Sequence, residues 1–290
     1  MDAGQGDMWD VPSKFVVEKM FMAREEMNNN VERILYGFWL SPYMSLVAHV
    51  LKEADLSFEY ERVSPFIGGT LSDQHRARNP LGKIPSLKEP NGVVISESQA
   101  ICRYLARCHR KARPFYPWDD PQGCAKVDSL SDFLTFSISG PFFNWFMVGA
   151  YFPKAFRLKT EEESMTFSKL SMVMVRGSLD RLVSGSDMTP FLLGSEPHVP
   201  DFHLFHILEL GKTFADMFDM PLFDLLHGDD ALNRFYNAML SRPSTQEILA
   251  SQAIELPVTE REIFEEFGKA YEPMLKQSRV GLQALFGHEV

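Results

Sequence analysis

Cysteine is scarce in this chain, and its spacing excludes several kinds of site. Only Cys102, Cys108 and Cys124 occur among the 290 residues. They form no CxxC motif and do not combine with histidine at a spacing typical of zinc ligands, so neither a disulfide framework nor a metal site is expected. This composition is typical of a protein in a reducing compartment.

Basic residues are outnumbered by acidic ones. The chain has 29 lysines and arginines against 39 aspartates and glutamates, a formal net charge of -10. Without a basic block, it offers no electrostatic attraction to nucleic acid or to an anionic membrane surface. No segment is apolar over the roughly 20 residues that a membrane-spanning helix needs. The start of the chain is acidic, unlike a secretory or transit peptide, so we expect a cytoplasmic protein.

The pattern of regular structure begins after a polar extension, residues 1–31, in which we expect at most one helix. Residues 34–38 are typical of a short strand. Ser41-Pro42 predicts a helix start, because serine is a favoured N-cap and proline a favoured first helical residue. Residues 58–63 predict a second strand, and strand, helix and strand in this order favour a parallel pair.

A β-hairpin is predicted after a poorly specified short helix within residues 68–78. Asn91-Gly92 favours the positive dihedral angles of a tight turn, and it lies between apolar segments at 84–87 and 93–95. Ser96-Glu97-Ser98-Gln99 matches a capping box, in which Ser96 caps a helix and Gln99 reaches back to it. The elements therefore follow the order β-α-β-α-β-β-α, with a mixed sheet.

The second half of the chain is almost wholly helical in pattern. A polar, proline-rich stretch separates it from the first half and predicts a linker. We expect a first domain at 32–110, the linker at 111–122, an all-helical domain at 123–255 and a helical tail at 256–290.

Several details of the helical half can be predicted. Gly140-Pro141 should end or kink a helix, and a later helix should start near Asp201, whose carboxylate orders its first turn. Thr259 to Glu262 matches a second capping box and predicts another helix start. The aromatic cluster from Phe133 to Tyr151 is mostly core in our interpretation, although part of it could face a cleft between the domains.

Three segments resemble the glutathione transferase superfamily, in its order and at comparable intervals: ILYGFWLSPYMSLVAHVLK, NPLGKIPSL and SESQAICRYLA. The resemblance extends from about residue 32 to 252 and leaves both ends of the chain unexplained. It implies a thioredoxin-like α/β N-terminal domain joined to an all-α helical bundle domain. It also implies glutathione as co-substrate, a homodimer and a role in detoxification.

The resemblance also implies which residues bind glutathione. This tripeptide presents two carboxylates, an ammonium group, two peptide groups and a thiol, so its site needs a helix N-terminus, an open strand edge and a partner for the thiol. Glu97 and Ser98 would hold the γ-glutamyl end. Ile84, before a cis Pro85, would pair with the cysteinyl backbone, and Lys83 would reach the glycyl carboxylate. Taken alone, the same residues could form a helix cap, an edge-strand proline and a solvated charge.

Ser41 is the candidate catalytic residue. In tyrosine-type members of the superfamily the hydroxyl comes from the end of the first strand, where this chain has Phe38, which has no proton to donate. In serine-type members, such as the zeta, theta and tau classes, the donor sits at the start of the first helix, the position of Ser41. Ser41 could instead be only a cap. Tyr36, Tyr43 and Ser45 are lesser candidates.

An apolar pocket beside the thiol should hold a small hydrophobic electrophile, and we expect Leu40 and Tyr43 to line it. His198, His203 and His206 have helical spacing but no convincing further ligand. We interpret these histidines as structural and expect no metal.

Three functions stay open at this point. The first is a glutathione transferase that activates the thiol for attack on a small apolar electrophile. The second keeps glutathione but changes the chemistry to isomerisation or peroxide reduction. The third is a non-catalytic binding or assembly module, since one fold hosts many functions and the two ends of the chain are plausible partner surfaces.

Overall fold

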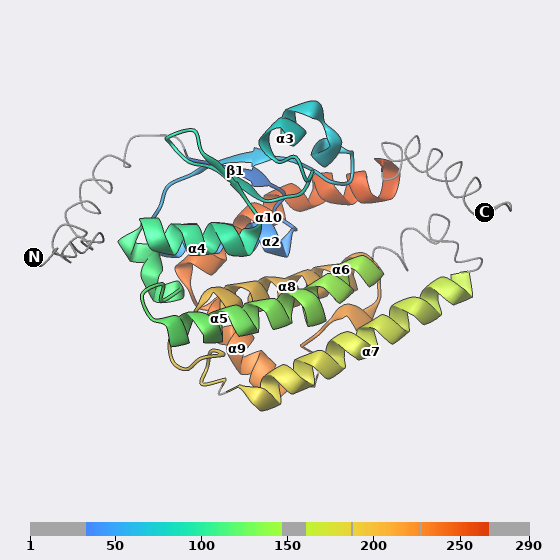
Figure 1. The fold of residues 1–290 in the computed structure, drawn as a ribbon. Helices are drawn as coiled ribbons and strands as arrows, with labels where there is room; N and C mark the ends of the chain where they lie inside the picture. The colour runs from blue at the N-terminus through green and yellow to red at the C-terminus, as the bar shows by residue number, and fades with distance from the viewer. Residues whose placement is uncertain (1–32, 147–160, 187, 227, 267–290) are drawn as a thin grey trace, which may run out of the picture.

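The computed structural model describes residues 33–146, 161–186, 188–226 and 228–266. The predicted extension, the predicted tail beyond residue 266, and Tyr151 at the end of the aromatic cluster lie outside the described residues. A domain of sheet and helices packs on a second domain made of helices (Figure 1). The predicted α/β and all-helical architecture is confirmed.

The sheet of the N-terminal domain has the order β2-β1-β3-β4. β1 pairs in parallel with β2 and antiparallel with β3, and β3 pairs antiparallel with β4, so the sheet is mixed as predicted. The register of β1 and β3 ends at Tyr36 opposite Ser86, which leaves the preceding Ile84 outside the ladder. The strands are β1 (Ile34–Gly37), β2 (Glu59–Arg62), β3 (Ser86–Lys88) and β4 (Val94–Ser96).

The helices of this domain are α2 (Pro42–Glu53), α3 (Asp73–Arg78) and α4 (Ser98–Cys108), with short 3-10 turns η1 (Gly69–Leu71) and η2 (Arg110–Phe115). α2 begins as predicted, because Ser41 is its N-cap and Pro42 its first residue. The capping box predicted for α4 is wrong. Its N-cap is Glu97, in the left-handed region at φ 68°, and no described side chain caps the helix.

The helical domain starts within the predicted linker, since α5 begins at Pro121. The break predicted at Gly140-Pro141 takes the form of a π-helical turn, η3, which joins two α-helical segments. Pro141 has no N–H to donate, and the wider turn accommodates it. The elements are α5 (Pro121–Phe133), η3 (Leu134–Ser139), α6 (Gly140–Phe146), α7 (Glu161–Gly185), α8 (Val199–Met217), η5 (Pro221–Phe223), α9 (Asp230–Leu240), α10 (Pro243–Arg261) and η6 (Glu262–Glu266).

The helix start predicted at Thr259 is also wrong. Thr259 is fully buried inside α10, which continues past Pro257. Glu255 and Glu262, on either side of Pro257, both bind Arg62 of β2. These long-range contacts hold the two sides of the proline in one helix, so the local capping pattern is overridden.

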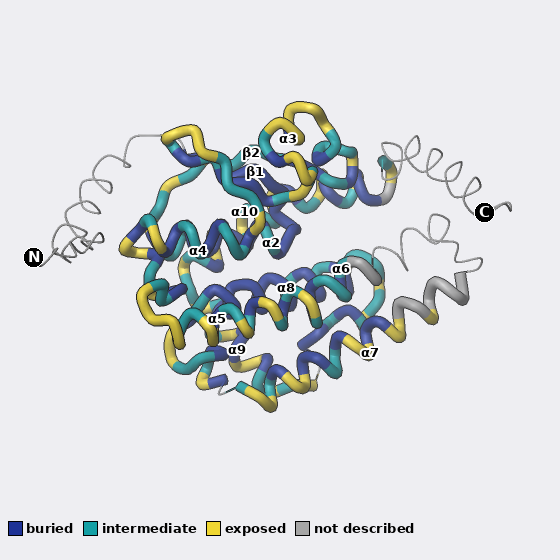
Figure 2. The backbone as a smooth tube through the Cα atoms, in the orientation of Figure 1, coloured by how far each residue is buried: buried dark blue, intermediate teal, exposed yellow. Residues whose placement is uncertain are grey.

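The packing of α2 on α8 joins the two domains. Both helices are largely buried along their length and lie in the middle of the molecule (Figure 2). The ring of His49 in α2 stacks on Phe202 in α8, with centroids 4.4 Å apart. His49 Nδ1 lies 3.1 Å from His206 Nε2. Among the described helices, none has the length and apolar content to cross a membrane.

Asp201 orders the start of α8, as predicted. Its side chain is fully buried, and its two oxygens accept hydrogen bonds at 2.8 Å from the backbone N–H groups of Leu192 and His198. The carboxylate therefore ties the loop before α8 to the first turn of the helix.

Replacing Asp201 with alanine should lower the free energy of unfolding by about 2 kcal/mol or more, because two backbone N–H groups lose their acceptor in a buried place. Asp229→Ala is the matched control. Asp229 caps α9 through a single bond to Leu232, so its loss should cost about 1 kcal/mol. Denaturant unfolding measures both, and equal losses would contradict the role given to Asp201.

Buried histidines should make the stability depend on pH. Burial lowers the pKa of both His49 and His203 to about 3, whereas a histidine in the unfolded chain titrates near 6.5. The unfolded chain therefore takes up protons first as the pH falls below about 6.5, and stability present above that pH is progressively lost. Asp201 acts in the opposite direction, since burial raises its pKa to about 7.

His203→Phe isolates one of these contributions, because neither ring nitrogen of His203 has a hydrogen-bond partner among the described residues. Below pH 6.5, the wild type should lose about 1.4 kcal/mol more stability per pH unit than the variant. Urea unfolding at pH 7, 6 and 5 measures the two slopes. The other titrating groups contribute equally to the wild type and the variant, so they cancel in the comparison. Identical slopes of stability against pH would show that His203 takes up its proton as readily in the folded protein as in the unfolded chain.

Candidate functional site

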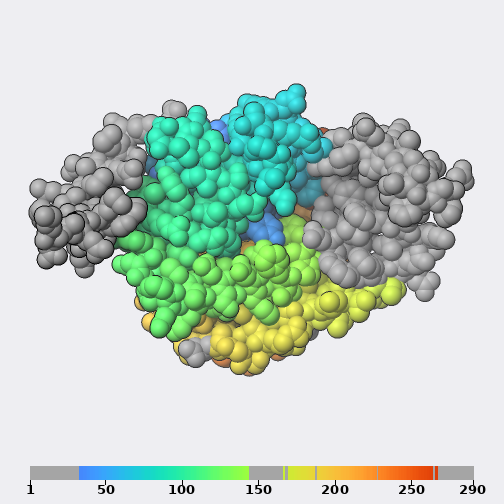
Figure 3. Space-filling view, viewed as in Figure 1, coloured from blue at the N-terminus to red at the C-terminus, as the bar shows by residue number. Residues whose placement is uncertain are grey.

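A cavity of about 600 Å³ lies between the two domains. The space-filling view shows the N-terminal domain, cyan to teal, over the green and yellow helical domain, with blue atoms of the β1–α2 end of the chain visible between them (Figure 3). The cavity is lined by Phe38, Ser41, Tyr43, Pro65, Phe66, Thr70, Gly82, Lys83, Ile84, Pro85, Glu97, Ser98, Gln99, Thr135, Gly140 and Phe143.

Ser41 lies at the cavity at the start of α2. Its Oγ accepts a long hydrogen bond from the N–H of Met44 at 3.4 Å. The cap uses the oxygen as acceptor and leaves the hydroxyl proton available for a ligand. The positive end of the α2 dipole points to the same place and favours a negative charge there.

The segment before β3 forms a second side of the cavity. The Ile84-Pro85 peptide bond is cis, as the resemblance implied. Two side chains fix the segment. Nε2 of His75 and Nδ2 of Asn79 each donate a hydrogen bond to the carbonyl oxygen of Lys83, at 2.8 Å. The side chain of Lys83 is exposed, and the backbone of Ile84 lies beyond the last paired residue of β3.

The start of α4 forms the third side. Since no described side chain caps this helix, the backbone N–H groups of its first turn are available to an anion. Glu97 has φ 68°, a conformation that is uncommon for a residue other than glycine and that clusters at functional sites. Ser98 follows it and is 8% exposed. The failure of the predicted cap therefore leaves an open helix terminus at the cavity.

Aromatic rings form the rest of the wall. Tyr43 lies with its ring centroid 5.9 Å from that of Phe143, and Phe38 meets Phe66 edge to face at 5.3 Å. Burial raises the pKa of the Tyr43 hydroxyl, and the charge of Glu97 adds to this effect. Tyr43 therefore keeps its proton at neutral pH.

Three other residues named from the sequence do not line the cavity. Leu40 is 7% exposed and packs in the hydrophobic core. The guanidinium of Arg78 lies over Tyr36, 4.2 Å from the centroid of the tyrosine ring. The hydroxyl of Ser45 donates to the backbone oxygen of Trp39 at 2.8 Å. Leu40 is next to Ser41 in the chain, but its side chain belongs to the hydrophobic core.

Sequence reasoning missed the cavity residues that belong to loops and to the helical domain. Thr70 and Gly82 lie in turns that hold no regular periodicity, and Gly82 adopts φ 61°. Thr135 and Gly140 face the cavity across the π-helical turn. The only local signal was Gly140-Pro141, because irregular helical turns are frequent at functional sites.

No metal site is formed by the part of the chain that the structure describes, where no group of three or more His, Cys, Asp or Glu side chains could hold an ion. His198 precedes α8, and its backbone N–H donates to Asp201. His203 and His206 are buried within α8.

Comparison with known proteins agrees with this geometry. Residues 35–113 match the family model described as "Glutathione S-transferase, N-terminal domain". "Glutathione S-transferase 4" of Zea mays is 37% identical over 76 residues, 26% of this chain and 34% of that protein. "Glutathione S-transferase theta-1" of Bos taurus is 40% identical over 77 residues, 27% of this chain and 31% of that protein. The alignments thus span about a third of these relatives.

Solved structures match a larger part of the chain. Poplar glutathione transferase F1 superposes with a TM-score of 0.61 at 20% identity, over 77% of this chain and 98% of that one. A glutathione transferase homologue from sulfitobacter, solved with bound glutathione, gives a TM-score of 0.59 at 20% identity, over 76% and 98%. At this identity the likeness shows the fold.

A thioredoxin-like domain packed on a helical domain, with a cavity between them, defines a class of two-domain proteins to which this chain belongs. The sequence match of residues 35–113 is specific to one family within it. Residues 35–113 therefore resemble the N-terminal domain of glutathione S-transferases, as the motifs of this segment predicted.

Gly140 is required at the cavity by a close approach. A Cβ atom there would lie 2.8 Å from the carbonyl oxygen of Thr135, so Gly140→Ala should cost about 1 to 3 kcal/mol of stability. Gly177→Ala in α7 is the control, because a Cβ at Gly177 would meet only the flexible end of Arg181, at 3.9 Å. That change should stabilise the protein by about 0.5 to 1 kcal/mol. Thermal or denaturant unfolding measures both variants. The assignment is refuted if the two substitutions change the free energy of unfolding in the same direction.

Proposed function

We propose that this protein is a glutathione transferase, which binds glutathione in the cavity and activates its thiol for attack on a small apolar electrophile. The observation that carries the proposal is that one cavity unites the N-cap Ser41, the unpaired segment at Ile84 and the uncapped start of α4 at Glu97 and Ser98. They would serve, in that order, as the thiol partner, the strand edge and the helix terminus that glutathione requires.

Each end of the tripeptide has a complementary group. The carboxylate of the γ-glutamyl end would accept from the first N–H groups of α4 and from the hydroxyl of Ser98, while the carboxylate of Glu97 would bind the ammonium group. The backbone of Ile84, beside Pro85, would pair with the cysteinyl residue as an added strand does. Lys83 would neutralise the glycyl carboxylate.

Ser41 would stabilise the thiolate. A free thiol has a pKa of about 8.5 and is mostly protonated at neutral pH, and lowering its pKa by two units needs roughly 2.7 kcal/mol. One hydroxyl donor together with a helix N-terminus can supply this free energy. The thiol proton passes to solvent, the sulfur forms a bond to the electrophilic carbon, and the leaving group departs with the electron pair of its former bond.

The apolar wall of Tyr43, Phe38, Phe66 and Phe143 would receive the electrophile beside the thiolate. Glutathione-dependent isomerisation or peroxide reduction would use the same thiolate, so product analysis separates them from transfer. Isomerisation regenerates glutathione, and peroxide reduction oxidises it. A role in detoxification and a homodimer stay predictions of the resemblance, and a cytoplasmic location stays a prediction of the composition.

Replacing Ser41 with alanine should strongly reduce the thiolate absorbance that the wild type shows with glutathione at pH 7. It should lower the conjugation rate by about 10- to 100-fold, because a hydrogen bond to a charged group is worth roughly 1.5 to 3 kcal/mol and the helix N-terminus remains. Ultraviolet difference titration across pH measures the thiolate. The expected midpoint for the wild type is about two units below that of free glutathione.

Ser72→Ala is the matched control, because Ser72 caps α3 through its bond to His75 at 3.2 Å and does not line the cavity. It should lose stability but keep the thiolate band. A full rate in Ser41→Ala would reduce Ser41 to a helix cap. If the wild type itself formed no bound thiolate, the non-catalytic binding module would be the better description.

A further inference from the structure

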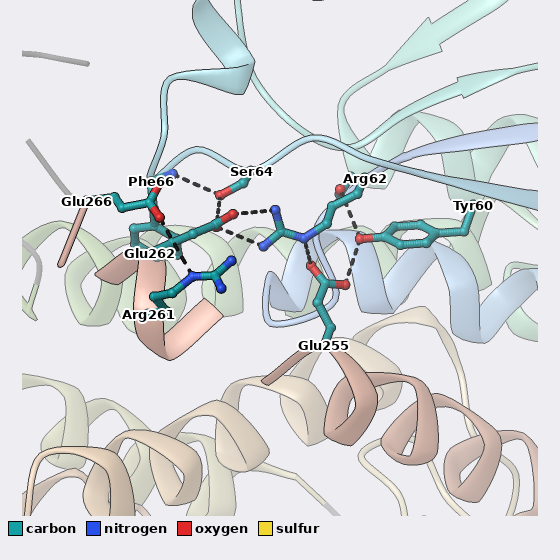
Figure 4. A network of polar contacts seen from close by, with 9 residues as sticks. Tyr60, Arg62, Ser64, Phe66, Glu255, Arg261, Glu262 and Glu266 are labelled. Carbon is teal, nitrogen blue, oxygen red and sulfur yellow. Dashed lines mark hydrogen bonds and ion pairs between the residues drawn. The ribbon is translucent and has the colours of Figure 1, made fainter. Parts of the chain in front are cut away.

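The end of α10 and the turn η6 bind the edge strand of the sheet. β2 is an edge strand, since it pairs only with β1 among the described strands. Its last residue, Arg62, lies between two glutamates that are 193 and 200 residues further along the chain (Figure 4). Both glutamates, Glu255 and Glu262, lie beyond residue 252, where the resemblance to the superfamily ends.

Arg62 and the two carboxylates form a cluster in which the carboxylates are buried and the Arg62 side chain is 26% exposed. Nε of Arg62 donates to Glu255 Oε1, and its two terminal nitrogens donate to the two oxygens of Glu262 at 2.7 and 2.8 Å. The side chains of Glu255 and Glu262 are 7% and 5% exposed. A buried bidentate pair of this kind fixes geometry as well as charge.

Two hydroxyl groups complete the cluster and divide its contacts into two branches. Tyr60 donates to Glu255 at 2.7 Å, and Ser64 donates to Glu262 at 2.6 Å. The hydroxyl of Tyr60 also donates to the backbone oxygen of Gly37 in β1 at 3.4 Å, so the branch through Tyr60 stays within the sheet. The branch through Ser64 enters the loop that follows β2 and that lines the cavity.

Ser64 connects Glu262 to the wall of the cavity. The Oγ of Ser64 accepts from the backbone N–H of Phe66 at 3.3 Å, and its backbone oxygen accepts from Gly69 at 2.8 Å. Phe66 packs against Phe38, and the guanidinium of Arg62 lies 5.7 Å from the centroid of Phe38. Both rings line the cavity.

We propose that Glu262 is a positioning residue, which holds Phe66 and Phe38 in place through Ser64 and Arg62 and so sets the affinity of the cavity for its apolar ligand. The assignment rests on the proposed transferase function. Glu262 touches neither glutathione nor the electrophile, because it does not line the cavity.

The test measures steady-state kinetics of the full chain with 1-chloro-2,4-dinitrobenzene and glutathione varied in turn. Glu262→Gln should raise the KM for the aromatic electrophile about fivefold to tenfold, the effect of roughly 1 kcal/mol of lost hydrogen bonding. The KM for glutathione should stay within about twofold. Ser64→Ala should raise the same KM by no more than Glu262→Gln does, and the double variant should be no worse than Glu262→Gln alone, since Ser64→Ala breaks one of the two connections that Glu262→Gln breaks.

Two controls separate positioning from a general loss of stability. Glu266 lies in the same turn and pairs with Arg261 at the surface, 3.7 Å apart. The control variant Glu266→Gln should therefore leave both KM values unchanged. Glu255→Gln loosens the same Arg62 but leaves Ser64 bound to Glu262. It should lower the melting temperature with a smaller effect on the electrophile KM than Glu262→Gln.

The outcomes distinguish this inference from the function itself. If glutathione does not bind the wild type, the proposed function fails. The apolar wall of the cavity is then tested with the dye 8-anilino-1-naphthalenesulfonate. Its binding should weaken in Glu262→Gln but not in Glu266→Gln. If Glu262→Gln lowers the melting temperature while electrophile KM and dye binding match the wild type, the inference is overturned. Should Glu262→Gln not fold, Ser64→Ala with wild-type KM values would overturn it equally.

Discussion

The packing of α2 against α8 is the contact on which the rest of the structure depends. It is made of buried side chains from both domains, with His49 stacked on Phe202 and bonded to His206. Because Ser41 caps the start of α2 and the start of α8 is fixed by Asp201, this interface determines where Ser41 lies relative to the helical domain.

The cavity combines two kinds of surface that favour different parts of a ligand. Its polar side is made of backbone groups at the starts of α2 and α4 and at Ile84, which suit a charged peptide. Its apolar side is made of aromatic rings from both domains. Leaving the start of α4 uncapped costs stability in the free protein, and a bound carboxylate would recover it. The conformation of Glu97 at φ 68° is a second such cost.

The elements of the N-terminal domain could be predicted well because each has a strong local signal, such as Asn91-Gly92 in the hairpin and Ser41-Pro42 at α2. The two capping boxes were wrong for a common reason. A serine or threonine followed by glutamate or glutamine describes what a helix start can do on its own, whereas the backbone conformation at Glu97 and the ion pairs around Thr259 go with different boundaries in the folded chain. Leu40 was misplaced because the direction of one side chain depends on the packing around it.

By itself, the sequence determined the α/β and all-helical architecture, the order of the elements in the first domain and most residue types on the polar side of the cavity, since short motifs and hydrophobic periodicity act over a few residues. Only the tertiary structure decided which of those residues meet. The side chains of Thr135 and Phe143 join the cavity from another domain, and Glu262 reaches Arg62 across 200 residues. Contacts between distant segments depend on how whole helices pack, and no local pattern in the chain specifies that packing.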